Sequence, residues 1–200
     1  IPIMKIQGEK NAKKVLVVEP HSDDGIYSAG GLLSKLFSEG SMIISVCVFS
    51  KHETLEIVRK REAERIYKDI FGGNVIFLNF LDGFFRTGNG IADSYMADYV
   101  AVKQALSECI KREEPDIVLG PLAIGGHIDH KLVHSALIAY CKKNKKFKMW
   151  FYEDYPYCNQ NRIQFFKKIS NLASQGRLHS KYVEISEFLY NKVSLNMVYR

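Results

Sequence analysis

Residues 15–20 read Val-Leu-Val-Val-Glu-Pro, an apolar run that leads directly into His-Ser-Asp-Asp at residues 21–24. A short run of β-branched residues without polar alternation is typical of a strand that is covered on both faces. Four more apolar runs follow along the chain, at residues 42–49, 74–80, 116–122 and 148–152. We expect all five to be strands of one sheet.

Segments with a helical spacing of apolar residues lie between these strands. They cover residues 26–39, 53–71, 91–114 and 129–143, and weaker helical patterns follow at 161–174 and 184–199. Strands that alternate with helices form βαβ units, whose right-handed crossovers place helices on both faces of a parallel sheet. The sequence therefore predicts an α/β fold, a Rossmann-like, doubly wound sandwich with a mostly parallel sheet of five or more strands. A chain of 200 residues has enough apolar material for one core, so we expect a single domain over residues 1–200.

The charge of the chain gives little support to a nucleic-acid partner. The chain has 28 basic and 22 acidic residues, a net charge of +6, and most of the excess is scattered. The one dense basic group, at residues 142–148, has the pattern of a solvated helix end, and no motif of a nucleic-acid-binding fold accompanies it. The sequence also has no secretory signal and no run of about 18 apolar residues. We expect a cytoplasmic protein without a transmembrane segment that acts on a small molecule, and a homo-oligomer is compatible with the sequence.

Two polar motifs are expected to meet at one edge of the predicted sheet. The first, at residues 21–24, follows the first strand, and the second, Gly-Gly-His-Ile-Asp-His at residues 125–130, follows the fourth. Ligands of such sheets bind beyond the carboxyl ends of the strands, where the strand order reverses. Two imidazoles and one carboxylate are a common ligand set for catalytic zinc, because they leave one coordination position open. The sequence therefore predicts a catalytic metal site.

The residue types also fit the hydrolysis of an amide. Of the two adjacent aspartates, one can bind the metal while the other takes a proton from water whose pKa zinc lowers to about 7. His127 and His130 are three residues apart, so one can bind the metal while the other stabilises the oxyanion or protonates the leaving amine. Asp129 can orient one of these imidazoles.

Four motifs together resemble the LmbE-like family, also called the PIG-L or N-acetylglucosaminyl-phosphatidylinositol de-N-acetylase superfamily. They lie at residues 20–24, 59–63, 81–83 and 115–130. The resemblance implies a zinc-dependent N-deacetylase whose metal ligands are His21, Asp24 and His130. It also implies that Asp23 is the general base and His127 the electrostatic or general-acid partner. Iron or another divalent metal could take the place of zinc.

The same resemblance suggests where a substrate binds. Arg59 and Asp82 match positions that face substrate hydroxyls in related sugar deacetylases, although a helix-face salt bridge and a turn would also explain them. The segment Tyr-Glu-Asp-Tyr-Pro-Tyr at residues 152–157 resembles one in a subset of the family. We expect Tyr152, Glu153 and Asp154 to line the substrate pocket, although packing or an interface would equally explain the tyrosines of this segment.

The expected substrate is a small N-acetylated amino sugar or glycoside. The sequence leaves open the hydrolysis of another amide, such as a thiol-sugar conjugate, and a noncatalytic sugar- or nucleotide-binding module. A dinucleotide site is disfavoured because the first turn lacks the Gly-rich pattern and presents two carboxylates instead. A non-haem iron oxygenase would need a β framework, which the alternating pattern does not provide. Residues 191–200 resemble a late helix of the family that stops before its expected Ser-Gln, so the C-terminal end is either incomplete or short.

Overall fold

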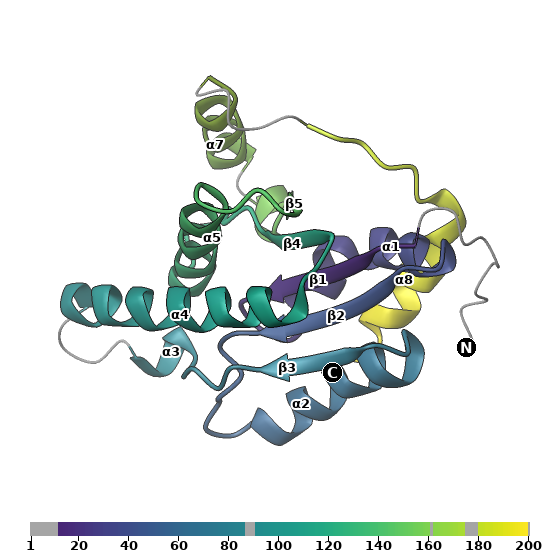
Figure 1. Ribbon diagram of the computed structural model, residues 1–200, viewed down its shortest axis with the longest axis horizontal. Coiled ribbons are helices and arrows are strands. Elements are labelled where there is room, and N and C mark those ends of the chain that lie inside the picture. The colour runs from purple at the N-terminus through teal and green to yellow at the C-terminus, as the bar shows by residue number, and fades with distance from the viewer. Residues whose placement is uncertain (1–11, 87–90, 161, 175–179, 200) are drawn as a thin grey trace.

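A single parallel sheet organises the chain, which a computed structural model describes over residues 12–86, 91–160, 162–174 and 180–199 (Figure 1). The sheet has five strands in the order β3-β2-β1-β4-β5. All four pairings are parallel. The strands are β1 (Lys14–Glu19), β2 (Met42–Cys47), β3 (Asn74–Phe77), β4 (Ile117–Pro121) and β5 (Lys148–Tyr152). The predicted α/β fold with a doubly wound parallel sheet is confirmed.

Helices cover both faces of the sheet because alternate residues of β1 are buried on opposite sides (Figure 1). Val15 and Val17 share a core with the helices α1 (Asp24–Ser38) and α8 (Leu189–Asn196) and with the segment around Tyr67. Leu16 and Val18 share the opposite core with α4 (Ile91–Glu113) and α5 (Ile128–Cys141). The continuous apolar run of β1 is therefore the centre of both cores.

The remaining helical elements differ in detail from the predicted segments. The predicted helix over 53–71 is divided into α2 (Glu56–Glu64) and a π-helical turn (Arg65–Ile70), and the last segment begins with a 3₁₀ turn (Ser186–Phe188). The helix α7 (Arg162–Ser174) follows its prediction closely, whereas α3 (Gly83–Arg86) and α6 (Tyr157–Gln160) were not predicted. Both are single turns, which are too short to show a helical period in the sequence.

The strand order reverses at β1. The chain runs outward from β1 to β2 and β3, and then returns to place β4 on the other side of β1. The carboxyl ends of β1 and β4 are therefore neighbours, and the two polar motifs that follow them lie side by side. Within the described residues, no helix has the length and apolar character needed to cross a bilayer. The single domain, the cytoplasmic location and the oligomeric state stay predictions.

Candidate metal centre

The loop after β1 folds back on itself and brings His21 to Asp24. The backbone N–H of His21 donates to Asp24 Oδ2 at 2.8 Å, and His21 Nδ1 lies 3.2 Å from the same oxygen. Asp24 is the first residue of α1, and Asp23 precedes it at the N-cap position. The apolar strand and the helix start thus fix two of the predicted ligands.

The third predicted ligand comes from the first turn of α5. His130 Nε2 lies 3.3 Å from Asp24 Oδ2, and one ligand atom from each of His21, Asp24 and His130 lies within 4.8 Å of the others. Ligand atoms at about 2.0–2.1 Å from a tetrahedral zinc ion are about 3.3 Å apart. The two contacts of Asp24 Oδ2 therefore already have the spacing of a tetrahedral metal site.

The ring nitrogens of these histidines that face away from the group are held by buried carboxylates. His130 Nδ1 lies 2.5 Å from Asp154 Oδ1, and the other oxygen of Asp154 accepts the backbone N–H of Ile124 at 3.1 Å. His21 Nε2 lies 3.1 Å from Asp129 Oδ2, which also accepts the N–H of Gly83 at 2.8 Å. A carboxylate behind a metal-binding imidazole fixes its tautomer and ring orientation.

Two of the residues expected to line the substrate pocket are placed differently. Asp154 is 1% exposed and contacts His130, and Tyr152 is 5% exposed with its hydroxyl donating to the carbonyl of Val18 at 3.3 Å. Side chains alternate across an extended segment, so Tyr152 and Asp154 point inward while Glu153 between them is exposed. The structure thus buries both side chains, and a pocket-lining role for Tyr152 and Asp154 stays a prediction.

Burial and charge act together on the carboxylates of the first motif. Burial alone would raise the pKa of Asp24, but the charge of His130 and the hydrogen bonds with His21 lower it to about 2. For Asp23, burial and the neighbouring charge of Asp24 raise the pKa above its usual value. One aspartate is therefore held ionised while its neighbour is made more basic.

His127 lies against both ligand histidines. Its ring centroid is 5.1 Å from that of His21 and 5.4 Å from that of His130. Its Nδ1 accepts the backbone N–H of Asp129 at 3.3 Å and so caps α5. Burial and the charge of His21 lower its pKa. A neutral His127 with Nδ1 as acceptor carries its proton on Nε2, so the ring is a hydrogen-bond donor.

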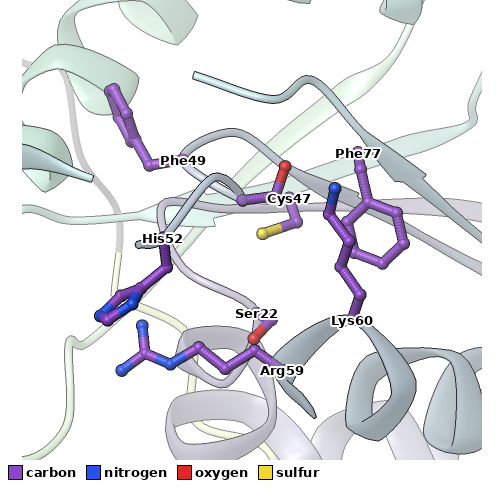
Figure 2. A pocket seen from close by; sticks show the side chains of 8 residues that line it. Ser22, Cys47, Phe49, His52, Arg59, Lys60 and Phe77 are labelled. Atoms are coloured by element: carbon purple, nitrogen blue, oxygen red, sulfur yellow. The ribbon is translucent and has the colours of Figure 1, made fainter. Parts of the chain in front are cut away.

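Arg59 and Asp82 lie beside the same group. Asp82 Oδ2 lies 3.7 Å from Arg59 Nη1 and 3.6 Å from His21 Nε2. The other carboxylate oxygen of Asp82, Oδ1, accepts the N–H of Phe84 at 2.9 Å. Arg59 also lines a small pocket that is open to solvent, where it extends toward His52 (Figure 2). Arg59 therefore reaches solvent beside the group, whereas Asp82 is 7% exposed.

Tyr157, the last residue of the 152–157 segment, also belongs to this site, although it was not among the residues expected to line the pocket. Its ring contacts that of His130, with the centroids 5.7 Å apart. A Cβ atom at Gly125, which has a φ of +86°, would lie 2.5 Å from Tyr157 Cβ, so the ring occupies space that only glycine leaves free. Burial and the charges of Asp24 and Asp23 raise the pKa of Tyr157.

The chain is similar to known deacetylases in sequence. It is 30% identical over 203 residues to 2'-N-acetylparomamine deacetylase of Streptomyces fradiae. This alignment covers 93% of this chain and 72% of that protein. It is also 30% identical over 135 residues to diacetylchitobiose deacetylase of Thermococcus kodakarensis. This alignment covers 60% of this chain and 46% of that protein.

The fold also has solved counterparts. A structure described as the zinc inhibited form of teicoplanin deacetylase Orf2 superposes with a TM-score of 0.65 at 18% sequence identity, and the match covers 90% of each chain. Residues 16–141 match the model of the PIG-L family, which is described as GlcNAc-PI de-N-acetylase. This match confirms the resemblance of the motifs, and the chain belongs to the PIG-L family.

Proposed function

We propose that this protein is a metal-dependent N-deacetylase that removes the acetyl group from a small N-acetylated amino sugar or glycoside. The observation that carries the proposal is the grouping of His21, Asp24 and His130 around one carboxylate oxygen, with contacts of 3.2 and 3.3 Å. The buried carboxylates Asp129 and Asp154 support this grouping from behind.

The donor set fits a zinc-class ion. Two neutral imidazoles and one carboxylate suit zinc, iron and related divalent metals, and three protein ligands leave a position for substrate or water. Of these metals we propose zinc. When bound, the metal supplies Lewis acidity to the amide carbonyl and to the attacking water.

Residues around the metal ligands transfer the proton and stabilise the oxyanion. Asp23, whose pKa is raised, takes a proton from the water as it attacks the carbonyl carbon. His127 donates a hydrogen bond from Nε2 to the developing oxyanion. As the C–N bond breaks, the proton held by Asp23 passes to the leaving nitrogen, and acetate and a free amine are the products.

The substrate class rests on the relatives together with the rim of the site. The two similar enzymes are named for N-acetylated amino sugars, 2'-N-acetylparomamine and diacetylchitobiose. We propose that Arg59, which lines a pocket beside the centre, and Glu153, the exposed residue next to Asp154, contact the sugar portion of the substrate. Asp82 then holds Arg59 in place through the 3.7 Å ion pair.

The test combines a metal assay with an acetate assay. The purified protein is analysed for bound metal and then incubated with a panel of N-acetylated amino sugars and glycosides. Asp23→Ala is expected to keep its metal and lose nearly all acetate release, whereas His130→Ala is expected to lose the metal. Full activity of Asp23→Ala would contradict the general-base role, and an active wild-type protein without any divalent metal would contradict the proposed function.

A further inference from the structure

The helix α1 begins without the side-chain cap that its sequence offers. Asp23 stands at the N-cap position, where an aspartate usually accepts a backbone N–H of the first turn. Within the described residues its side chain makes no such bond, and its backbone is helical, with φ −104° and ψ −18°. Capping residues are typically extended instead. The carboxylate proposed as the general base is therefore not engaged at the end of the helix.

Glu19 supplies the missing acceptor from the end of β1. Its side chain is fully buried, and Oε2 accepts the N–H of Gly25, the second residue of α1, at 2.7 Å. Ser45 Oγ lies 2.5 Å from the other oxygen, Oε1, and so holds the side chain in this orientation. A carboxylate and a carboxylic acid both have an oxygen that accepts a hydrogen bond. The contact with Gly25 is therefore possible in either protonation state of Glu19.

The contact depends on the absence of a side chain at Gly25. A Cβ atom built on this residue would lie 2.7 Å from Glu19 Oε2 and 2.9 Å from Val17 Cγ1. Any other residue at this position would therefore push the carboxyl group of Glu19 away from the backbone N–H that it accepts. Glu19 and Gly25 thus act as a pair, and the cap of α1 needs both.

The carboxyl group of Asp23 lies among the charged groups of the metal centre. Burial and the charge of Asp24 raise the pKa of Asp23, and the charges of His21 and Arg59 partly offset this rise. A cap bond from Asp23 to the first turn of α1 would need an extended backbone and would turn the carboxylate toward the helix. Capping and proton transfer therefore compete for this one side chain.

We propose that Glu19 is a positioning residue of the metal centre: it caps α1 in place of Asp23 and so leaves the carboxylate of Asp23 available to the attacking water. The inference rests on the proposed function, in which Asp23 is the general base. Without an acceptor at residue 19, the N–H of Gly25 is buried and unpaired, and α1 is stabilised when Asp23 changes its backbone and caps the helix. The base is then withdrawn while the three metal ligands keep their places.

Steady-state kinetics of the metal-loaded variants test this role. Glu19→Leu removes the acceptor and should lower kcat for acetate release by about 100-fold, the effect of displacing a catalytic group by about 1 Å. KM and the metal content should equal those of the wild-type protein. Glu19→Gln should keep kcat, because its amide oxygen can accept the N–H of Gly25 while its amide nitrogen donates to Ser45.

A matched control removes a buried polar group of α1 away from the cap. Ser34 is fully buried, and its Oγ donates to the carbonyl of Gly30 at 2.8 Å. Ser34→Ala should therefore keep the kcat of the wild-type protein. If Glu19→Leu does not fold, Gly25→Ala takes its place, because the added Cβ displaces the carboxyl group of Glu19. The same loss of kcat with unchanged metal content is expected.

Urea unfolding of the metal-free proteins tests the exchange of caps without any measurement of activity. In the wild-type background Asp23→Ala removes no cap and should not raise the equilibrium constant for unfolding. In the Glu19→Leu background the same change removes the new cap. It should then raise this constant about fivefold, which is the effect of losing a typical N-cap.

Three results would overturn the proposal: a folded Glu19→Leu protein with the kcat of the wild type, an equal loss of kcat in Glu19→Gln, or the same effect of Asp23→Ala on unfolding in both backgrounds. A wild-type protein that releases no acetate, or full activity of Asp23→Ala, would instead contradict the proposed function. The unfolding measurements would still decide whether Glu19 is the residue that caps α1.

Discussion

The contact between His130 and Asp154 provides the sharpest test of the metal centre. Asp154 has two oxygens and two buried donors, the imidazole Nδ1–H of His130 at 2.5 Å and the backbone N–H of Ile124 at 3.1 Å. In Asp154→Asn only one oxygen remains, and the amide nitrogen must face one of these donors. If the nitrogen faces His130, the ring accepts through Nδ1 and carries its proton on Nε2, the atom that lies near Asp24.

A protonated Nε2 cannot bind a metal, and the alternative orientation leaves a buried backbone donor without an acceptor. Removing such a supporting partner typically costs about 10–100-fold in metal affinity, or about 1.4–2.8 kcal/mol. We therefore expect the zinc dissociation constant of Asp154→Asn to rise by that factor. The volume of the side chain is almost unchanged, so the protein should remain folded.

Competition with a chromogenic chelator measures the dissociation constant directly, and circular dichroism checks the fold. Glu153→Gln is the matched control, since it makes the same change of carboxylate to amide at the adjacent, exposed residue. Its zinc affinity should equal that of the wild-type protein. A folded Asp154→Asn protein that binds zinc within twofold of the wild type would refute the assignment of Asp154 as the residue that orients His130.

Three further changes test the surroundings of the site. Gly125→Ala should lower the free energy of unfolding, measured by urea titration, by about 1–3 kcal/mol, because the added Cβ meets Tyr157. Gly126→Ala should lower it less, because Gly126 has a similar φ of +87° but its added Cβ would meet no atom closer than 3.7 Å. Leu33→Ala removes a fully buried side chain of α1 and should cost about 2–5 kcal/mol, with little effect on metal affinity per folded molecule. Burial raises the pKa of Glu19 from 4.5 to about 8, so the folded state keeps a proton that the unfolded chain releases. The free energy of unfolding of the metal-free protein should therefore fall as the pH rises from about 4.5 to about 8. Glu19→Gln should flatten this fall. An equal slope in both proteins would contradict the assignment of the fall to Glu19.

The local sequence was sufficient for the five strands, the longer helices and the positions of the polar motifs. The run at residues 15–20 is apolar without alternation because β1 is covered on both faces, and this property is visible without any tertiary contact. His21, Asp24 and His130 follow two strands of a parallel sheet, and the carboxyl ends of such strands share an edge. Periodicity and fold rules therefore brought the two motifs to one edge, and the family resemblance singled out the three residues that the structure groups together.

The sequence already indicated that Asp129 could orient an imidazole, but only the tertiary structure decided that it stands behind His21 and that Asp154 stands behind His130. Asp154 meets His130 across 24 residues of sequence, and Asp129 meets His21 across 108. Whether a carboxylate after β5 points inward to a histidine or outward to a substrate depends on the register of the strand and on the packing of α5, and neither leaves a local pattern in the sequence. The same holds for Tyr157, which reaches His130 only because Gly125 has no side chain. The sequence by itself determined the strands, the longer helices and the edge where the polar groups collect, because these follow from local periodicity and from the rules of parallel sheets. The partners within that edge were decided by packing, because each contact joins side chains from separate elements.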